Sequence, residues 1–174
     1  MGVRARQVAT SIESETLYLN RTVRFFVIQN IQRIDHIVFL VHLENLETAM
    51  RDFEQLLDIT LSGPHYKPDM GIKIYVDWES GIEIYAPVNP EIAVEQSEFL
   101  RTRGEGIFRL VFGVADREAA IARAENLGHP IKARVGGFSV TDDWRSVFKR
   151  LDEAPLAAPV HGVWLNFGQL EPVD

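Results

Sequence analysis

The sequence predicts an α+β protein in which one structural unit is written twice. Two apolar segments with strand-like alternation, residues 34–41 and 107–114, resemble each other, and a helical pattern directly follows each of them. Shorter alternating segments come after each helical pattern. The chain has 174 residues, a length that suits one domain or two small units around a shared core. We therefore expect two related halves that fold together.

Composition places the chain among ordinary globular proteins. It is 46% hydrophobic and 25% charged, and no stretch approaches the ~20 consecutive apolar residues of a membrane span. The 25 acidic residues outnumber the 18 basic ones, and the net charge of -7 disfavours binding to nucleic acid. Cysteine is absent, which excludes thiolate metal sites and cysteine nucleophiles and suits a reducing cytosol. Composition thus predicts a cytoplasmic protein that binds neither nucleic acid nor membrane.

The first strand of the chain carries a histidine at its start. Side chains alternate across a strand, so His36 shares one face with Val38 and Leu40, and the other face is apolar. An amphipathic helix is predicted next, with Asn45 as its N-cap. Its apolar positions are Leu46, Ala49, Met50, Phe53, Leu56 and Leu57. Residues 72–76 and 82–85 then alternate as strands on either side of a turn.

The second half of the chain repeats this order with different polar residues. Arg109 takes the place of His36 in the second strand, and Asp116 is the predicted N-cap of the helix that follows. Residues 87–106 form the connector between halves and hold a short run that could be helical. Residues 138–140 could form a strand, and residues 162–168 close the half as one. Aligning this last strand with residues 81–85 puts Trp164 in the place of Glu83.

These features resemble the vicinal oxygen chelate superfamily of glyoxalases, bleomycin-resistance proteins and extradiol dioxygenases. The resemblance rests on the segment Asp35-His36-Ile37-Val38-Phe39, on residues 81–85, and on the partial repeat at Phe108 and Trp164. It implies two βαβββ modules paired around a curled-sheet cavity, with the helices outside. Residues 33–168 would then form a single domain, with module one at 33–88 and module two at 106–168, after an N-terminal extension of residues 1–32.

The resemblance also bears on whether the protein uses a metal. Metal enzymes of this superfamily take their ligands from the first and last strands of the modules, and His36 and Glu83 match two such positions. Arg109 and Trp164 fall at the other two, and neither side chain can ligate a cation. A catalytic divalent metal normally needs three protein ligands and one open position, so metal-free functions are favoured. A third ligand could come from a second chain in a homodimer, or from His42, Asp143 or His161.

The alternation of the strands predicts which side chains share a surface. His36 and Glu83 are the candidate catalytic residues and should point into one cavity, and Lys73 should join them. The predicted ligand-binding residues are Arg109, Tyr75, Tyr85, Trp164 and Asn166. An aromatic wall with a few converging polar groups is typical of small-molecule sites. The alternative is that the aromatic rings merely fill the curled sheet, but buried charges without a ligand or mutual pairing would be costly.

Three functions stay open at this point. A metal-dependent glyoxalase, epimerase or dioxygenase would use His36 and Glu83 to hold a metal that polarises a substrate oxygen. A metal-free lyase or isomerase would use Glu83 or His36 to move a proton, while Arg109 pairs with Glu83 or with an oxygen-rich or anionic substrate. A drug- or metabolite-sequestering protein would have the cavity without chemistry. We expect a small-molecule-binding, glyoxalase-like protein of the lyase or isomerase kind.

Overall fold

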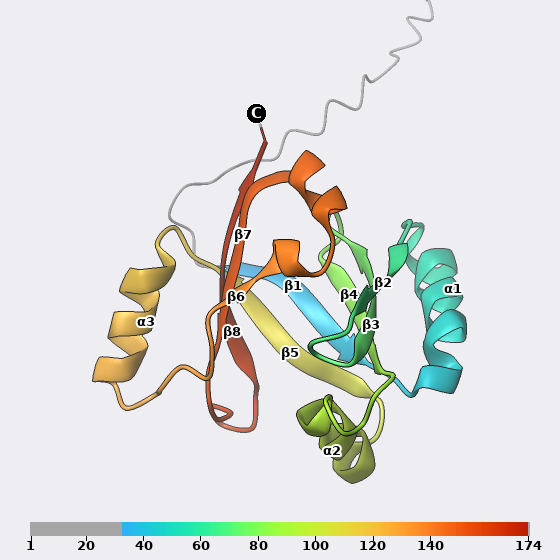
Figure 1. The fold of residues 1–174 in the computed structure, drawn as a ribbon, viewed down its shortest axis with the longest axis horizontal. Helices are drawn as coiled ribbons and strands as arrows, with labels where there is room; N and C mark the ends of the chain where they lie inside the picture. Colours follow the sequence, from blue (N-terminus) through green and yellow to red (C-terminus); the bar gives the residue numbers. More distant parts are fainter. Residues whose placement is uncertain (1–32, 174) are drawn as a thin grey trace, which may run out of the picture.

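A single curled sheet of eight strands organises the molecule (Figure 1). The structure, a computed structural model, describes residues 33–173, and the predicted extension of residues 1–32 lies outside this range. The strands lie in the order β2-β3-β4-β1-β5-β8-β7-β6. Strands of the first half of the chain therefore occupy one side of the sheet, and strands of the second half occupy the other.

Each half of the chain builds the same arrangement. The first half consists of β1 (Arg33–Leu40), the 3-10 turn η1 (Leu43–Asn45), α1 (Leu46–Leu57), β2 (Ser62–Lys67), β3 (Ile72–Asp77) and β4 (Ile82–Pro87). The helix α2 (Val94–Arg103) connects the halves. The second half consists of β5 (Gly106–Gly113), α3 (Arg117–Asn126), β6 (Val135–Gly136), η2 (Gly137–Ser139), η3 (Asp142–Ser146), β7 (Phe148–Pro155) and β8 (Leu165–Pro172). β1 runs parallel to β4, and β5 runs parallel to β8, so both halves are βαβββ units.

The two halves join where β1 and β5 pair antiparallel at the centre of the sheet. The pairing is interrupted twice, because Asp35 in β1 and Phe108 in β5 have no residue opposite them. Each is a β-bulge, in which one extra residue bends the strand and re-aims its neighbours. The two bulges directly precede His36 and Arg109. Their matching positions support the prediction that Arg109 is the counterpart of His36.

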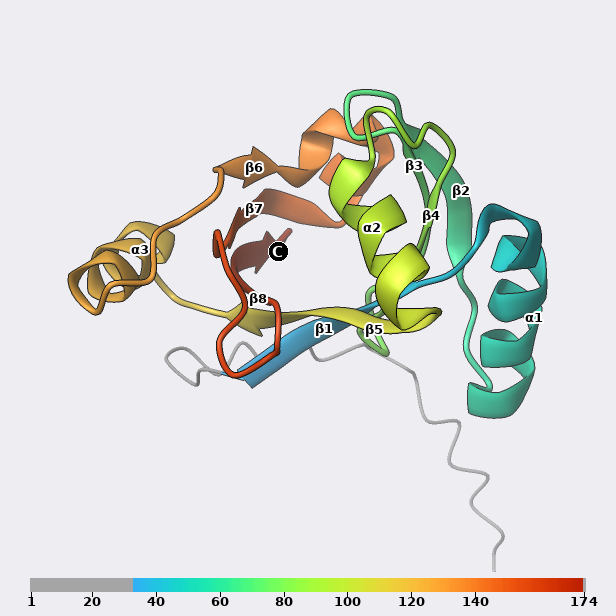
Figure 2. The same ribbon diagram turned by 90° about the horizontal axis from the view of Figure 1, so that it is seen from below.

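Helices cover the outside of the curl. α1 and α3 lie on its two flanks, and α2 lies at one end (Figure 2). α1 packs its apolar stripe on the outer face of the first half, where Leu46 is buried with Tyr75 and Ile84. The Asp116 side chain caps α3 by accepting a hydrogen bond from the Ala119 N–H at 2.9 Å, as predicted. None of the helices in residues 33–173 has the length and apolar character needed to cross a membrane.

The inner face of the curl holds a core that both halves share. Ile72, Ile74 and Val76 of β3 pack against side chains from the other half of the chain. Those partners are Trp144, Phe148 and Leu151. Burying apolar surface between the halves stabilises both of them at once. The curl is therefore closed by side-chain packing and not by strand pairing, because β2 and β6 remain the two edges of the sheet.

Some local predictions were wrong. The Asn45 side chain does not cap α1; it donates a hydrogen bond to Glu105 Oε1 at 2.8 Å. The segment predicted as a strand at residues 138–140 begins in a 3-10 turn, and the last strand spans Leu165–Pro172, not residues 162–168. β7 was not predicted, because the sequence before it and within it is rich in charged residues.

Candidate active site in the curled sheet

A cavity of about 340 Å³ lies inside the curl and takes its walls from both halves of the chain. Aromatic and aliphatic side chains make most of its surface, and several charged side chains reach it. The residues that line it include Lys67, Trp78, Glu83, Tyr85, Glu95, Arg109, Lys132, Trp144, Glu153 and Asn166. This size and this mixture of apolar wall and polar groups are typical of a site for a small organic molecule.

His36 lies behind this cavity, enclosed by three carboxylates. Its side chain is 1% exposed, and its Nδ1 lies 3.1 Å from Asp35 Oδ1 of the bulge in β1. Its Nε2 lies 3.4 Å from Glu83 Oε2 and 3.5 Å from Glu153 Oε1. The structure thus brings His36 and Glu83 together, as expected. However, Glu83 and Glu153 line the cavity and His36 does not, so only the carboxylates can meet a ligand directly.

The three groups at the centre of this cluster differ in proton affinity. Burial lowers the pKa of His36, but its hydrogen bond with Asp35 and its contacts with the two glutamates outweigh burial and raise the pKa well above the ordinary value. Burial raises the pKa of Glu83, and His36 offsets this only in part. Burial also acts to raise the pKa of Glu153, but its contact with His36 and its other partners bring the pKa below the ordinary value. At neutral pH we therefore expect a charged imidazole, an ionised Glu153 and a Glu83 that binds its proton more tightly.

Arg109 of β5 also lines the cavity and belongs to the same polar network. It is 6% exposed, and its Nη1 donates to Asn166 Oδ1 at 3.0 Å. Asn166 Nδ2 donates in turn to Glu153 Oε2 at 2.8 Å. The Nη2 of Arg109 lies 2.7 Å from Glu95 Oε1 of α2. Of the two expected partners of Arg109, Glu83 is not the one that pairs with it, because Glu95 takes that place; pairing with an anionic substrate stays a prediction.

The sheet register also corrects the predicted place of Trp164. Glu83 is paired with Val38 of β1, and the residue paired with the corresponding Val111 of β5 is Asn166. Asn166, and not Trp164, is therefore the counterpart of Glu83. Trp164 precedes β8 and is absent from the cavity wall; its ring lies 5.5 Å from the Arg109 guanidinium. It packs on the arginine instead of facing a ligand.

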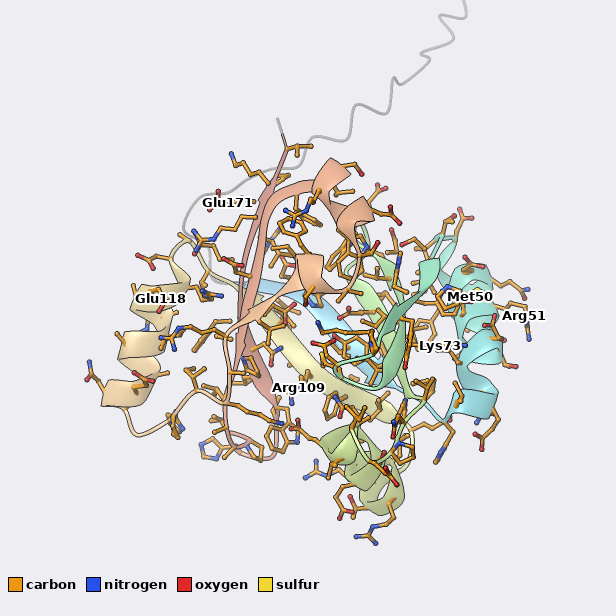
Figure 3. The ribbon with its side chains drawn as sticks, viewed as in Figure 1. Met50, Arg51, Lys73, Arg109, Glu118 and Glu171 are labelled. Atoms are coloured by element: carbon orange, nitrogen blue, oxygen red, sulfur yellow. The ribbon has the colours of Figure 1, made fainter. Side chains whose placement is uncertain are left out.

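Tyr75 and Lys73 lie on the wrong face to meet a ligand, contrary to prediction. Both alternate with Ile74, which points into the shared inner core. The Tyr75 hydroxyl donates to Glu47 Oε1 of α1 at 2.9 Å, and burial raises its pKa to about 12. Lys73 lies on the side of β3 toward α1, whereas Arg109 lies over the middle of the curl (Figure 3). Tyr85, in contrast, lines the cavity beside Glu83, and burial raises its pKa well above the ordinary value.

Comparison with known proteins identifies the framework. A family model described as a glyoxalase-like domain matches residues 34–161. The chain belongs to the glyoxalase-like domain family. It is thereby a member of the vicinal oxygen chelate superfamily, as the sequence resemblance implied. The comparison with curated proteins found no significant match.

Solved structures share the fold of this glyoxalase-like domain. A hypothetical protein from Bacillus halodurans is 25% identical, with a TM-score of 0.62 over 79% of this chain and 94% of that one. Methylmalonyl-CoA epimerase from Mycobacterium tuberculosis is 20% identical, with a TM-score of 0.63 over 87% and 95%. A Streptomyces coelicolor methylmalonyl-CoA epimerase in complex with 2-nitronate-propionyl-CoA is 20% identical, with a TM-score of 0.59 over 80% and 97%. The curled sheet with outer helices is the fold of the superfamily.

The donor set of this glyoxalase-like domain does not fit a divalent metal. His36 and Glu83 stand at two of the superfamily's ligand positions, but Arg109 and Asn166 fill the other two, and Arg109 carries a permanent positive charge. Within residues 33–173, no group of three or more histidine or acidic side chains is arranged to hold a metal ion. The proposed third ligands His42, Asp143 and His161 are all exposed.

Sequence reasoning missed several polar residues of the site. Glu153 lies two residues after the core residue Leu151 on β7 and so shares its face, which means that strand parity would have found it if β7 had been predicted. Glu95 lies in the first turn of α2, in a segment interpreted only as a connector. Trp78 and Trp144 also line the cavity, and their buried indole N–H groups have no hydrogen-bond partner. No pattern in the sequence marks these two rings as neighbours, because only the folded sheet brings them within 5.1 Å.

Proposed function

We propose that this glyoxalase-like domain is an enzyme of the isomerase or lyase kind, which moves a proton on a small anionic organic substrate. The observation that supports it is the cluster of buried His36, buried Glu83 and partly buried Glu153, both of whose carboxylates line the cavity. At these distances, His36 Nε2 and Glu83 Oε2 are buried without a full hydrogen bond. Such unsatisfied groups are costly, and in native proteins they often mark a functional site.

The proposed division of labour follows from the environments of the two glutamates. Glu153 has a lowered pKa and is the base that removes a proton from carbon. Glu83 has a raised pKa and is the acid that supplies one. Two carboxyl groups whose surroundings shift their pKa values in opposite directions are a common arrangement for acid and base catalysis. His36 contacts both glutamates and helps to keep one ionised while the other is protonated. Arg109 binds the negative group of the substrate.

The names of two structural relatives support the isomerase class. An epimerase inverts a stereocentre, and next to a carbonyl this requires a proton to leave carbon and return. Because these relatives are 20% identical to this chain, their substrate is used only as one of the compounds to be tested.

The test is carbon-bound hydrogen exchange. Chelator-treated protein is incubated in D2O with 2-substituted carboxylic acids and their CoA thioesters, and proton NMR follows the hydrogen at carbon 2. We expect exchange with at least one compound, and a fall of about 10²–10⁴-fold in Glu153→Gln. Glu125→Gln, an exposed change on α3, is the control. Exchange that returns only with added divalent metal would favour the metal-dependent alternative that uses His36 and Glu83.

A sequestering role without chemistry is the second candidate. The unpartnered indole N–H groups of Trp78 and Trp144 favour it, because a bound ligand with acceptor atoms would satisfy them. Binding of a panel compound without any exchange of its hydrogen would select this function. We also propose that the protein is cytoplasmic and that it forms a homodimer, and sedimentation velocity would test the dimer.

A further inference from the structure

The cavity contains a carboxylate of the protein itself, held between two cations. Glu95 Oε1 lies 2.7 Å from Arg109 Nη2, and Glu95 Oε2 contacts Lys132 Nζ. The three side chains come from α2, from β5 and from the segment before β6, and all three line the cavity. One cation contacts each carboxylate oxygen, so the position between Arg109 and Lys132 fits a carboxylate in both shape and charge.

Arg109 is held in position by contacts that do not involve Glu95. Asn166 Oδ1 accepts from its Nη1 at 3.0 Å, and the rings of Phe108 and Trp164 lie 4.7 Å and 5.5 Å from the guanidinium carbon. Planar stacking and a fixed hydrogen bond keep a guanidinium pre-organised. The guanidinium would therefore stay in place, facing the cavity, if Glu95 turned away.

Glu95 is the more exposed partner in its ion pair with Arg109. Its side chain is 20% exposed, whereas that of Arg109 is 7% exposed. α2 is anchored by other residues, since Gln96 and Leu100 are its buried side chains. Release of Glu95 toward solvent therefore needs a change of rotamer and not the unfolding of the helix.

We propose that Arg109 and Lys132 form the subsite for the carboxylate of the substrate, and that Glu95 fills this subsite until a substrate carboxylate displaces it. This rests on the proposed function for the reaction itself, and it names the substrate class as small carboxylic acids. Asn166 bridges Arg109 and Glu153. A carboxylate bound at Arg109 thus places the neighbouring carbon of the acid toward the proposed base. Exchange of one carboxylate for another conserves both ion pairs, so displacement leaves no buried cation unpaired.

Propionate is the probe for the carboxylate subsite, and propionamide is its uncharged analogue. Isothermal titration of the full chain with each compound measures affinity for the native protein and for Glu95→Gln. An internal competitor that fills a site for about nine-tenths of the time weakens the apparent affinity about tenfold. We therefore expect Glu95→Gln to bind propionate at least about tenfold more tightly. Propionamide binding should not change.

Three further variants determine whether the gain in affinity comes from freeing Arg109. Glu98→Gln on the same helix removes a carboxylate that pairs with Arg101 outside the cavity, and it should bind propionate as the native protein does. Adding Arg109→Gln to Glu95→Gln should abolish the gain. Should Glu95→Gln fail to fold, Glu95→Asp withdraws the carboxylate by one methylene and should also bind propionate more tightly than the native protein.

Propionate binding by the Glu95 variant that is equal to or weaker than that of the native protein would overturn the proposal. If the melting temperature of this variant were also lowered, the role of Glu95 would be to hold α2 in place. The outcome is independent of the D2O test. A Glu95 variant that binds propionate more tightly, in a protein that exchanges no hydrogen, would leave the subsite standing and remove the catalytic role.

Discussion

At the scale of single residues, His36 is the centre of the site. A buried imidazole touching three carboxylates is stabilised in its charged form, because the carboxylates outweigh the cost of burial. Because Nε2 contacts both Glu83 and Glu153, a proton gained or lost on either carboxylate changes the electrostatic energy of the other.

The raised pKa of His36 makes stability depend on pH. A folded-state pKa above the unfolded value of about 6.5 means that the folded protein binds more protons between these two values. The stabilisation is complete below the unfolded pKa and is lost as pH rises through the folded pKa. The free energy of unfolding should therefore fall by up to about 1.4 kcal/mol per pH unit above neutrality.

Urea unfolding at several pH values measures this slope. Glu83 also has a raised pKa, so its contribution has the same sign and begins at lower pH, above its ordinary pKa; His36→Gln should therefore reduce the slope above neutrality. His129→Gln, at an exposed position, is the matched control and should keep the full slope. A slope in His36→Gln equal to that of the native protein would contradict a charged His36.

Asn166 of β8 connects Arg109 of β5 with Glu153 of β7. Replacing it with leucine removes the acceptor for Arg109 and the donor for Glu153. Removing one partner of a buried charged group typically costs about 1.5–3 kcal/mol, so Asn166→Leu should be less stable by about this amount. Glu153 loses one of the contacts that lower its pKa, so the acid limb of the exchange rate should move to higher pH. An unchanged pH profile would exclude Asn166 as a positioning residue.

At the scale of elements, the bulge at Asp35 sets how β1 presents His36. The turn before β4 packs directly on this bulge, because a Cβ on Gly81 would lie 2.5 Å from the Asp35 carbonyl oxygen. Gly81 also has a φ of 70°, which disfavours other residues. Its carbonyl accepts a hydrogen bond from the Ile37 N–H at 2.8 Å. One glycine thus fixes the spacing between the strands that carry His36 and Glu83.

Gly81→Ala and Gly128→Ala make a matched pair that isolates this contact. Both positions have positive φ, but a Cβ on Gly128 meets nothing within 4 Å. Gly128→Ala should cost about 1 kcal/mol of stability for the backbone conformation alone. Gly81→Ala should cost roughly 1–3 kcal/mol more, because it also forces the strands apart. Chemical denaturation measures both, and equal losses would show that the close approach does not matter.

Strongly periodic elements could be predicted from the sequence, and others could not. The strand around His36 and α1 have clear apolar periods, and α3 was predicted with the help of its N-cap Asp116; the order of these elements predicted the repeated unit. β7 combines charged and apolar residues whose alternation is not visible without its neighbours, so Glu153 was missed. Tyr75 was assigned to the wrong face because its parity relative to Glu83 depends on how β3 pairs with β4. Trp164 was misplaced by two residues for the same reason.

At the scale of the whole molecule, the halves share both a sheet and a core. β1 and β5 pair along their length, and β3 packs on η3 and β7 across the cavity. A half separated from the other would expose this surface to water, which costs free energy in proportion to its apolar area. We therefore propose that residues 33–168 act as one folding unit, within which neither module is stable alone.

Cooperative unfolding is the expected consequence. All three tryptophans, Trp78, Trp144 and Trp164, lie in or beside the region where the halves meet. Their fluorescence should change at the same urea concentration as the far-ultraviolet circular dichroism, as in two-state unfolding. Trp144→Ala, which empties a buried position shared by the halves, should shift both transitions together and cost about 3–5 kcal/mol. Two separated transitions would contradict a shared core.

The paired bulges of β1 and β5 have a consequence for how a ligand can sit. A cavity built from two identical halves would accept a molecule equally well in either of two poses related by a half-turn. Here one half offers His36 and Glu83, and the other offers Arg109 and Asn166 at the matching positions. The half-turn would move an acidic group of the ligand from Arg109 to the place of His36, where the carboxylates of Glu83 and Glu153 line the cavity. Divergence of the two copies thus gives a duplicated framework a single binding direction.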